Sequence, residues 1–197
     1  MQEITKAEMD IVLNLVKSPE VLYNGNNLAN VINITPTGAL KILKRLERES
    51  VLKSKKIGKA TIYKINTEDK YTVGYVLLIL SRERLYVQPI VKRWLQELKK
   101  IKNADLIILF GSVLEKENPN DIDVLFVTDK KRFPNLQKEI EELNNINIKR
   151  IHPIYQTFED IVSNIKKGHK PLLNAIKGII VKGEDKFLEV YDESRKE

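Results

Sequence analysis

Two aspartates, Asp121 and Asp123, combine a side-chain type and a spacing that suit metal chemistry. They open a largely apolar run, Asp121–Val127, that is typical of a β-strand. Because successive side chains of a strand point to opposite faces, the two carboxylates should project together on one face. Paired carboxylates repel each other and favour a bound cation, and Mg²⁺ takes oxygen ligands. The spacing therefore predicts a magnesium site at Asp121 and Asp123.

A Gly-Ser pair lies shortly upstream of the aspartates. Gly111 and Ser112 follow a short apolar run, Leu106–Phe110, that reads as a buried strand. A turn leading into a helix would present backbone N–H groups and the Ser112 hydroxyl, which suit phosphate oxygens. Together with the carboxylate pair, these groups are the parts of a metal-assisted phosphoryl or nucleotidyl transfer site.

The order of these features resembles a known family. An apolar strand, Gly-Ser, a short spacer and Asp-x-Asp inside an apolar strand resemble the minimal nucleotidyltransferase domains of the polymerase-β-like superfamily. The resemblance runs from Ala104 to the C-terminus, with further strands expected at Ile148–Tyr155 and Lys177–Gly183. It implies a mixed-sheet α/β domain that uses Mg²⁺ and a nucleoside triphosphate. The implied roles are catalytic and metal-binding for Asp121 and Asp123, and nucleotide-binding for Gly111 and Ser112.

The sequence departs from this family at the next strand. Members usually carry a third carboxylate there, whereas Asn147–Tyr155 contains no acidic residue. The spacer Val113–Asn120 is also shorter than is common in the family. The two histidines, His152 and His169, have no second ligand at helical spacing, so both are expected to be structural. Two interpretations remain open: a domain that binds nucleotide and Mg²⁺ without turnover, and an active transferase that moves NMP to a hydroxyl of a protein, an RNA or a small molecule.

The positive charge of the chain is concentrated near its N-terminus. The formal net charge is +7, and the stretch Pro36–Lys64 alone holds nine basic and two acidic residues. A basic stripe confined to one small module indicates a polyanionic partner, most simply nucleic acid.

The same region has the pattern of a winged helix-turn-helix within residues 1–67. A capping box at Thr5 and Glu8 opens a first helix, a shorter helix follows, and Thr35-Pro36 opens a third. Two short strands around Gly58 then predict a β-hairpin. The stretch from Leu28 to Asn66 resembles winged-helix regulators, especially archaeal ones, which implies a third helix in the major groove of double-stranded DNA. The expected DNA contacts are Thr37, Lys41, Lys44, Arg45 and Arg48 on the third helix, and Lys55, Lys56 and Lys59 on the hairpin.

Between these two modules, residues 68–102 read as a helical connector. Its apolar side chains recur at helical spacing and are too many for a solvated linker, so they should pack against a flanking domain or a second copy of the chain. We expect a homodimer built on this face. The residues of the expected dimer face are Val73, Val76, Leu80 and Trp94.

The predicted fold class is α+β in three parts: residues 1–67, the connector 68–102, and a nucleotidyltransferase-like domain over residues 103–197. The chain has no cysteine and no long apolar run, which favours a cytoplasmic protein without a membrane partner. An excess of lysine over arginine hints at heat adaptation. The favoured function is a DNA-binding transcriptional regulator with a nucleotide-binding second domain. The alternatives are an active nucleotidyltransferase and an interaction scaffold.

Overall fold

The structure is a computed structural model that describes residues 3–196, and the chain falls into two compact units divided between Leu80 and Ser81. Helices combine with a two-stranded and a four-stranded sheet, so the predicted α+β class is confirmed. The expected connector is shared between the units. Its first helix, α4 (Lys70–Glu83), begins in the first unit, and α5 (Pro89–Leu98) belongs to the second.

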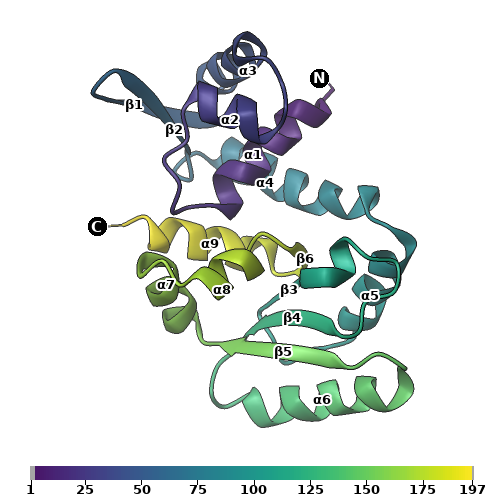
Figure 1. Cartoon of the computed structure of the whole chain (residues 1–197). Coiled ribbons are helices and arrows are strands. Elements are labelled where there is room, and N and C mark those ends of the chain that lie inside the picture. Colours follow the sequence, from purple (N-terminus) through teal and green to yellow (C-terminus); the bar gives the residue numbers. More distant parts are fainter. Residues whose placement is uncertain (1–2, 197) are drawn as a thin grey trace. The chain divides into compact units, whose positions relative to one another are not determined.

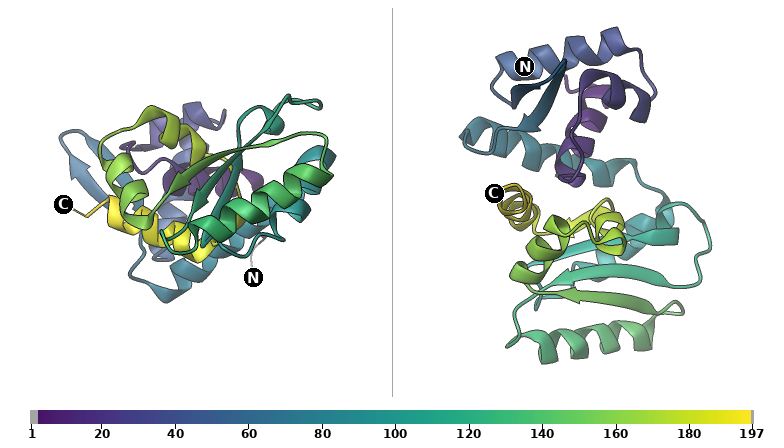
Figure 2. Two further views of the ribbon diagram at one scale, coloured as in Figure 1. Left: turned by 90° about the horizontal axis from the view of Figure 1, so that it is seen from below. Right: turned by 60° about the vertical axis from the view of Figure 1, so that its left-hand side comes forward.

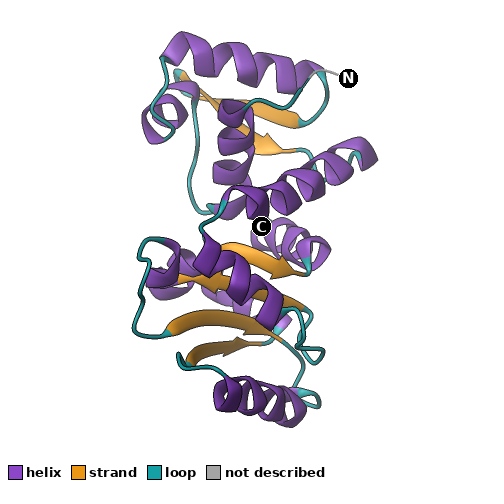
Figure 3. Ribbon diagram, turned by 90° about the vertical axis from the view of Figure 1, so that its right-hand side faces the viewer, coloured by secondary structure: helices purple, strands orange, loops and turns teal. Residues whose placement is uncertain are grey.

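The first unit contains three helices followed by an antiparallel hairpin, which is the architecture of a winged helix-turn-helix (Figures 1 and 3). The segment before the second helix adds to this hairpin, because the Tyr63 N–H donates to the Tyr23 carbonyl at 2.9 Å. The elements are α1 (Lys6–Lys17), α2 (Gly25–Val31), α3 (Pro36–Arg48), β1 (Leu52–Ile57) and β2 (Ala60–Ile65).

Helix α3 begins where its sequence predicts. The Thr35 hydroxyl accepts a hydrogen bond from the Gly38 N–H at 3.1 Å, and Pro36 occupies the first turn, where a missing N–H costs nothing. The apolar stripe that faces the core of the unit is Ala39, Leu43 and Leu46, all fully buried. The opposite side of α3 is therefore left for its charged residues.

The second unit is built on a mixed four-stranded sheet of order β5-β4-β3-β6. Strand β3 is antiparallel to both β4 and β6, whereas β4 and β5 are parallel. The mixed sheet predicted from the sequence is therefore present. The strands are β3 (Leu106–Phe110), β4 (Ile122–Val127), β5 (Ile151–Gln156) and β6 (Ile179–Lys182).

Helices cover both faces of this sheet (Figure 2). On one face, α5 and α6 contribute Trp94, Leu98 and Ile140 to a continuous apolar core that includes Val124 and Phe126 of β4. On the other face, α8 and α9 contact β3. The remaining elements are η1 (Arg84–Tyr86), η2 (Gly111–Leu114), α6 (Phe133–Ile146), α7 (Phe158–Lys166), α8 (Lys170–Ala175) and α9 (Glu184–Ser194).

The prediction that the apolar face of the connector forms a dimer contact is wrong. Val76 and Leu80 are fully buried within a single chain, and Trp94 lies in the core of the second unit. Side chains that one chain already buries cannot also form a contact with a second copy. Among residues 3–196, no helix combines the length and apolar character needed to cross a bilayer.

Candidate functional site

The candidate metal and phosphate residues meet at one end of the four-stranded sheet. The antiparallel register places Phe110, the last residue of β3, opposite Asp123 of β4. The parallel register places Asp123 beside His152 of β5. Gly111 and Ser112 follow β3 directly and open the short helix η2. The topology thus brings three segments that are far apart in the sequence to the same end of the sheet.

Gly111 is in contact with the carboxylate of Asp123. Its φ of +77° lies in the left-handed region, and a Cβ atom built there would stand 2.2 Å from Asp123 Oδ2. Both the backbone conformation and the lack of space therefore require glycine at this position. Ser112 is partly buried beside it. The geometry joins the Gly-Ser turn to the carboxylate pair, and the phosphate-binding role of the turn stays a prediction.

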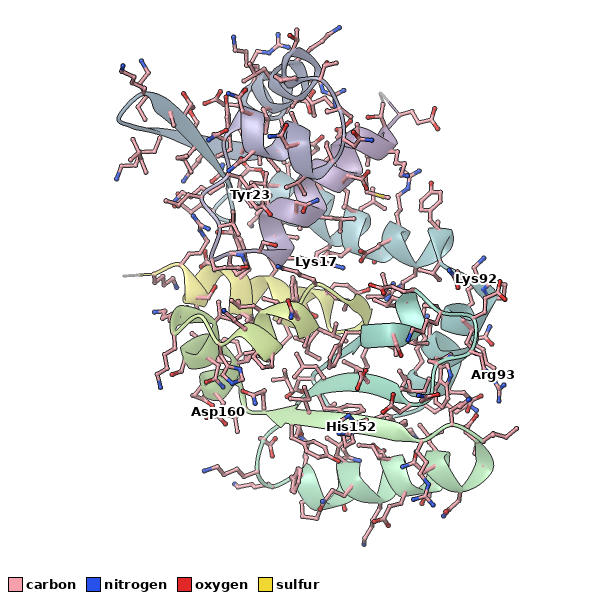
Figure 4. All side chains as sticks on the ribbon, viewed as in Figure 1. Lys17, Tyr23, Lys92, Arg93, His152 and Asp160 are labelled. Carbon is pink, nitrogen blue, oxygen red and sulfur yellow. The ribbon has the colours of Figure 1, made fainter. Side chains whose placement is uncertain are left out.

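A third side chain completes this cluster. His152 Nδ1 lies 3.1 Å from Asp123 Oδ1, and one ligand atom from each of Asp121, Asp123 and His152 lies within 4.8 Å of the others. Figure 4 labels His152 on β5. Carboxylate oxygens and an imidazole nitrogen are ligand types for divalent cations, so these residues fit a divalent cation. Asp121 and His152 are exposed and Asp123 is partly exposed, which leaves the ligand atoms accessible.

His152 was expected to be structural because the sequence places no second ligand at helical spacing from it. Its neighbour Asp123 instead lies on the adjacent strand, where residues in register share a face of the sheet. The signal available in the sequence was the position of His152 near the start of the strand that follows the Asp-x-Asp strand. The other histidine, His169, lies at the start of α8.

A cavity of about 560 Å³ lies at the opposite end of the same sheet. Its lining includes Arg132, whose guanidinium binds both Asp105 and Asp129. The hydrogen bonds that Arg132 donates to the side chain of Asp105 first, and then to that of Asp129, raise the pKa of Arg132 above its usual value. Arg132, Asp105 and Asp129 thus form one ion-pair network, which connects the start of β3 to the loop after β4.

The candidate DNA-binding residues are mostly exposed. Nitrogen-tipped side chains extend away from the ribbon around the turn between β1 and β2 (Figure 4). An exposed lysine or arginine keeps its charge in water, where it can meet a phosphate without first losing a protein partner. The exposed members of the predicted set are Thr37, Lys41, Lys44, Arg48, Lys55, Lys56 and Lys59.

Arg45 differs from the rest of that set. Its side chain is 20% exposed and forms an ion pair with Glu8, whose side chain is 4% exposed. The Tyr75 hydroxyl donates a hydrogen bond to the other oxygen of the same carboxylate. Arg45 therefore points into the unit rather than toward a groove. The carboxylate of Glu8 is engaged here, so it does not complete the predicted capping box, although the Glu8 N–H still binds the Thr5 hydroxyl.

This trio of Glu8, Arg45 and Tyr75 connects α1, α3 and α4. Burial raises the pKa of Tyr75, and the hydrogen bond to the charged Glu8 raises it further. Tyr75 therefore stays protonated and keeps donating its proton at any ordinary pH. Because α3 is the candidate recognition helix, the trio fixes the orientation of the helix from its buried side.

We expect Glu8→Ala to destabilise the first unit by roughly 3 kcal/mol, because it leaves the partly buried guanidinium of Arg45 without its counter-charge. Native-state hydrogen exchange of the α1 and α3 amides would measure the loss. Glu3→Ala, which removes an exposed carboxylate from the same end of the chain, is the matched control. Equal protection in Glu8→Ala and the control would show that the buried pair contributes nothing to stability.

The fold and the site define a class: a winged-helix unit joined to a mixed α/β unit that carries an Asp-Asp-His cluster at one sheet edge. The model of DUF6932, a family of unknown function, matches residues 52–196, which is most of the chain. The chain belongs to this family. The match begins at β1 and includes the hairpin and the second unit.

Comparison with solved structures finds ZitR of Lactococcus lactis. A mutant of ZitR is 17% identical, with a TM-score of 0.36 over 50% of this chain and 62% of that chain. The crystal structure described as a zinc-responsive MarR family member, also ZitR, is 13% identical, with a TM-score of 0.31 over 50% of this chain and 76% of that chain. The chain thus spans less than two thirds of the first of these, and TM-scores this low carry no inference. No curated protein matches the sequence.

Proposed function

We propose that this protein is a DNA-binding transcriptional regulator whose second unit binds a nucleoside triphosphate together with a divalent cation. One observation carries the DNA-binding part: six exposed positive charges of the first unit are on α3 and the hairpin, the two elements that a winged helix applies to DNA. These charges are Lys41, Lys44 and Arg48 on α3, and Lys55, Lys56 and Lys59 on the hairpin.

The two elements have different tasks in this proposal. Helix α3 enters the major groove, where the exposed residues of its first half, Thr37 and Lys41, meet base edges. The hairpin lies along the neighbouring backbone, where Lys56 and Lys59 meet phosphates. Arg45 acts from inside the unit through Glu8, as a residue that positions α3 rather than one that touches DNA.

In the second unit, Asp121 and Asp123 hold the cation, and Gly111 and Ser112 hold phosphate oxygens of the nucleotide. A bound cation would neutralise the charge of the triphosphate. The contact between Gly111 and Asp123 supports this assignment, because it places the two predicted ligand groups side by side. The cluster also supports a second candidate function, an active nucleotidyltransferase, because a third possible ligand, His152, lies on the strand where the resembling family carries its third carboxylate.

The DNA-binding proposal is tested by selecting preferred duplex sequences from a random pool and then measuring variants. Alanine at Thr37 or Lys41 should change the sequence preference, by about 1–3 kcal/mol for each good base contact. Alanine at Lys56 or Lys59 should weaken binding to all duplexes alike, because phosphate contacts carry no sequence information. If the α3 variants and the hairpin variants both weaken binding to all duplexes alike, α3 is not the element that contacts base edges.

Dimerisation and a cytoplasmic location stay predictions. A dimer would suit two half-sites related by symmetry on the DNA, but it needs a surface other than the buried face of the former connector.

A further inference from the structure

The imidazole of His152 stands where a cation held by Asp121 and Asp123 would be within its reach. We propose that His152 Nδ1 is the third protein ligand of this site, and that the resulting set of two oxygens and one nitrogen selects a transition-metal ion such as Mn²⁺ over Mg²⁺. This inference rests on the proposed function of the second unit, because it names the cation that the site takes.

The distance between His152 Nδ1 and Asp123 Oδ1 matches the separation expected for two ligands of one ion. Neighbouring ligands at about 2.1 Å from an octahedral ion are about 3 Å apart, since the angle between them is 90°. His152 Nδ1 and Asp123 Oδ1 are 3.1 Å apart. A single ion can therefore contact both atoms without moving the strands. Asp121 is exposed at the start of β4 and has room to turn an oxygen toward the same point.

The strand pairing holds this arrangement in place. Asp123 and His152 are direct neighbours in the parallel β4–β5 register, so their side chains leave the sheet on the same face. The following pairs continue the register through Val127 and Gln156, which fixes the alignment along the whole length of both strands. A one-residue slip would turn one of the two side chains to the other face.

The ligand chemistry then determines which ion is preferred. Mg²⁺ is a hard ion that selects oxygen ligands and gives up its waters reluctantly. Imidazole suits transition metals, and affinity for mixed nitrogen and oxygen sites rises from Mn²⁺ along the first row. A site with a carboxylate on the third strand would keep an all-oxygen set. Because β5 contains no acidic residue, the ligand that this strand offers to an ion is the nitrogen of His152.

The same 3.1 Å contact also suits a plain hydrogen bond in which His152 orients Asp123, so the test has to detect the metal–nitrogen bond itself. The experiment uses the full chain with Mn²⁺ as the probe. Pulsed electron paramagnetic resonance reports a nitrogen nucleus bound to Mn²⁺ through modulation of the echo. We expect ¹⁴N modulation in the unmutated protein and in His169→Ala, which removes the other histidine, and no modulation in His152→Ala.

Affinity gives a second readout from the same samples. His152→Ala should weaken Mn²⁺ binding about tenfold or more, since losing even an indirect partner of a metal ligand costs that much. His152→Asp should restore a third oxygen and raise the affinity for Mg²⁺ relative to Mn²⁺. His169→Ala should bind both ions as the unmutated protein does.

The outcomes separate this inference from the function on which it rests. If the unmutated protein binds Mn²⁺ without ¹⁴N modulation, and His152→Ala keeps its affinity, His152 is not a ligand and the inference is overturned. The cation site at Asp121 and Asp123 then stands as an oxygen site. If the unmutated protein binds neither Mn²⁺ nor Mg²⁺, with or without a nucleoside triphosphate, both the inference and the nucleotide part of the proposed function are overturned.

Discussion

Asp123→Ala should abolish cation-dependent binding of a nucleoside triphosphate, with a loss in affinity of about a hundredfold or more. Asp123 is the central member of the cluster, because its carboxylate contacts Gly111 on one side and His152 on the other. Isothermal titration with ATP or GTP in the presence of Mg²⁺ or Mn²⁺ measures the loss. Ser112→Ala should have a milder effect, since the backbone N–H groups of the turn remain.

The fold should tolerate this substitution. Removing one carboxylate from a pair relieves repulsion between like charges, so the cation-free protein should be as stable as before or slightly more stable. Glu117→Ala, which removes an exposed acid from the loop between the two motifs, is the matched control and should bind nucleotide normally. If the unmutated protein binds no nucleotide under these conditions, the second unit is better described as an interaction scaffold. Transfer of label from the nucleotide to an acceptor would favour the enzyme instead.

The second large effect concerns the charges of the first unit. A variant with alanine at Lys41, Lys44, Lys56 and Lys59 should bind duplex DNA about a hundredfold or more weakly at low salt, because four positive charges of the proposed DNA-binding surface are lost together. Fluorescence anisotropy with a labelled duplex measures the change. The control removes the same number of charges from exposed positions of the second unit. Its substitutions are alanine at Lys99, Lys166, Lys167 and Lys170.

The comparison of these two variants separates position from net charge. Both lose four positive charges, so a general attraction between a basic protein and DNA would weaken them equally. If instead α3 and the hairpin form the binding surface, the control keeps nearly all of its affinity. Equal losses would therefore contradict the assignment of the surface, even if both variants bind DNA less well than the unmutated protein.

Features set by local sequence could be predicted. The start of α3 follows from Thr35 and Pro36, since a cap and a preset backbone angle act within one turn. The hairpin follows from the glycine turn at Gly58, whose φ is +58°. Strands β3 and β4 follow from short apolar runs that end at Gly111 and begin at Asp121. In each case the determining residues are close together in the chain.

Features set by packing between distant segments could not be predicted. Arg45 looked like a DNA contact from its place on α3, but its partners Glu8 and Tyr75 come from α1 and α4. The contact between His152 and Asp123 depends on the parallel pairing of β4 with β5, and these two strands are separated in the sequence by α6. The expected connector is divided after Leu80, and this division depends on which unit the apolar face of each of its helices packs against. The sequence pattern shows that one face of a helix is apolar, but it does not show which element packs against that face.

The salt dependence of DNA binding by the unmutated full chain tests the central claim most directly. If about five of the six exposed lysines and arginines that are predicted to contact DNA meet phosphates, the logarithm of the affinity should fall with the logarithm of salt concentration with a slope of roughly −4 to −5. The slope follows because each phosphate contact releases counterions from the duplex. Anisotropy titrations of one labelled duplex at several salt concentrations give this slope. An absence of binding at low salt, or an affinity that does not change with salt, would contradict the account.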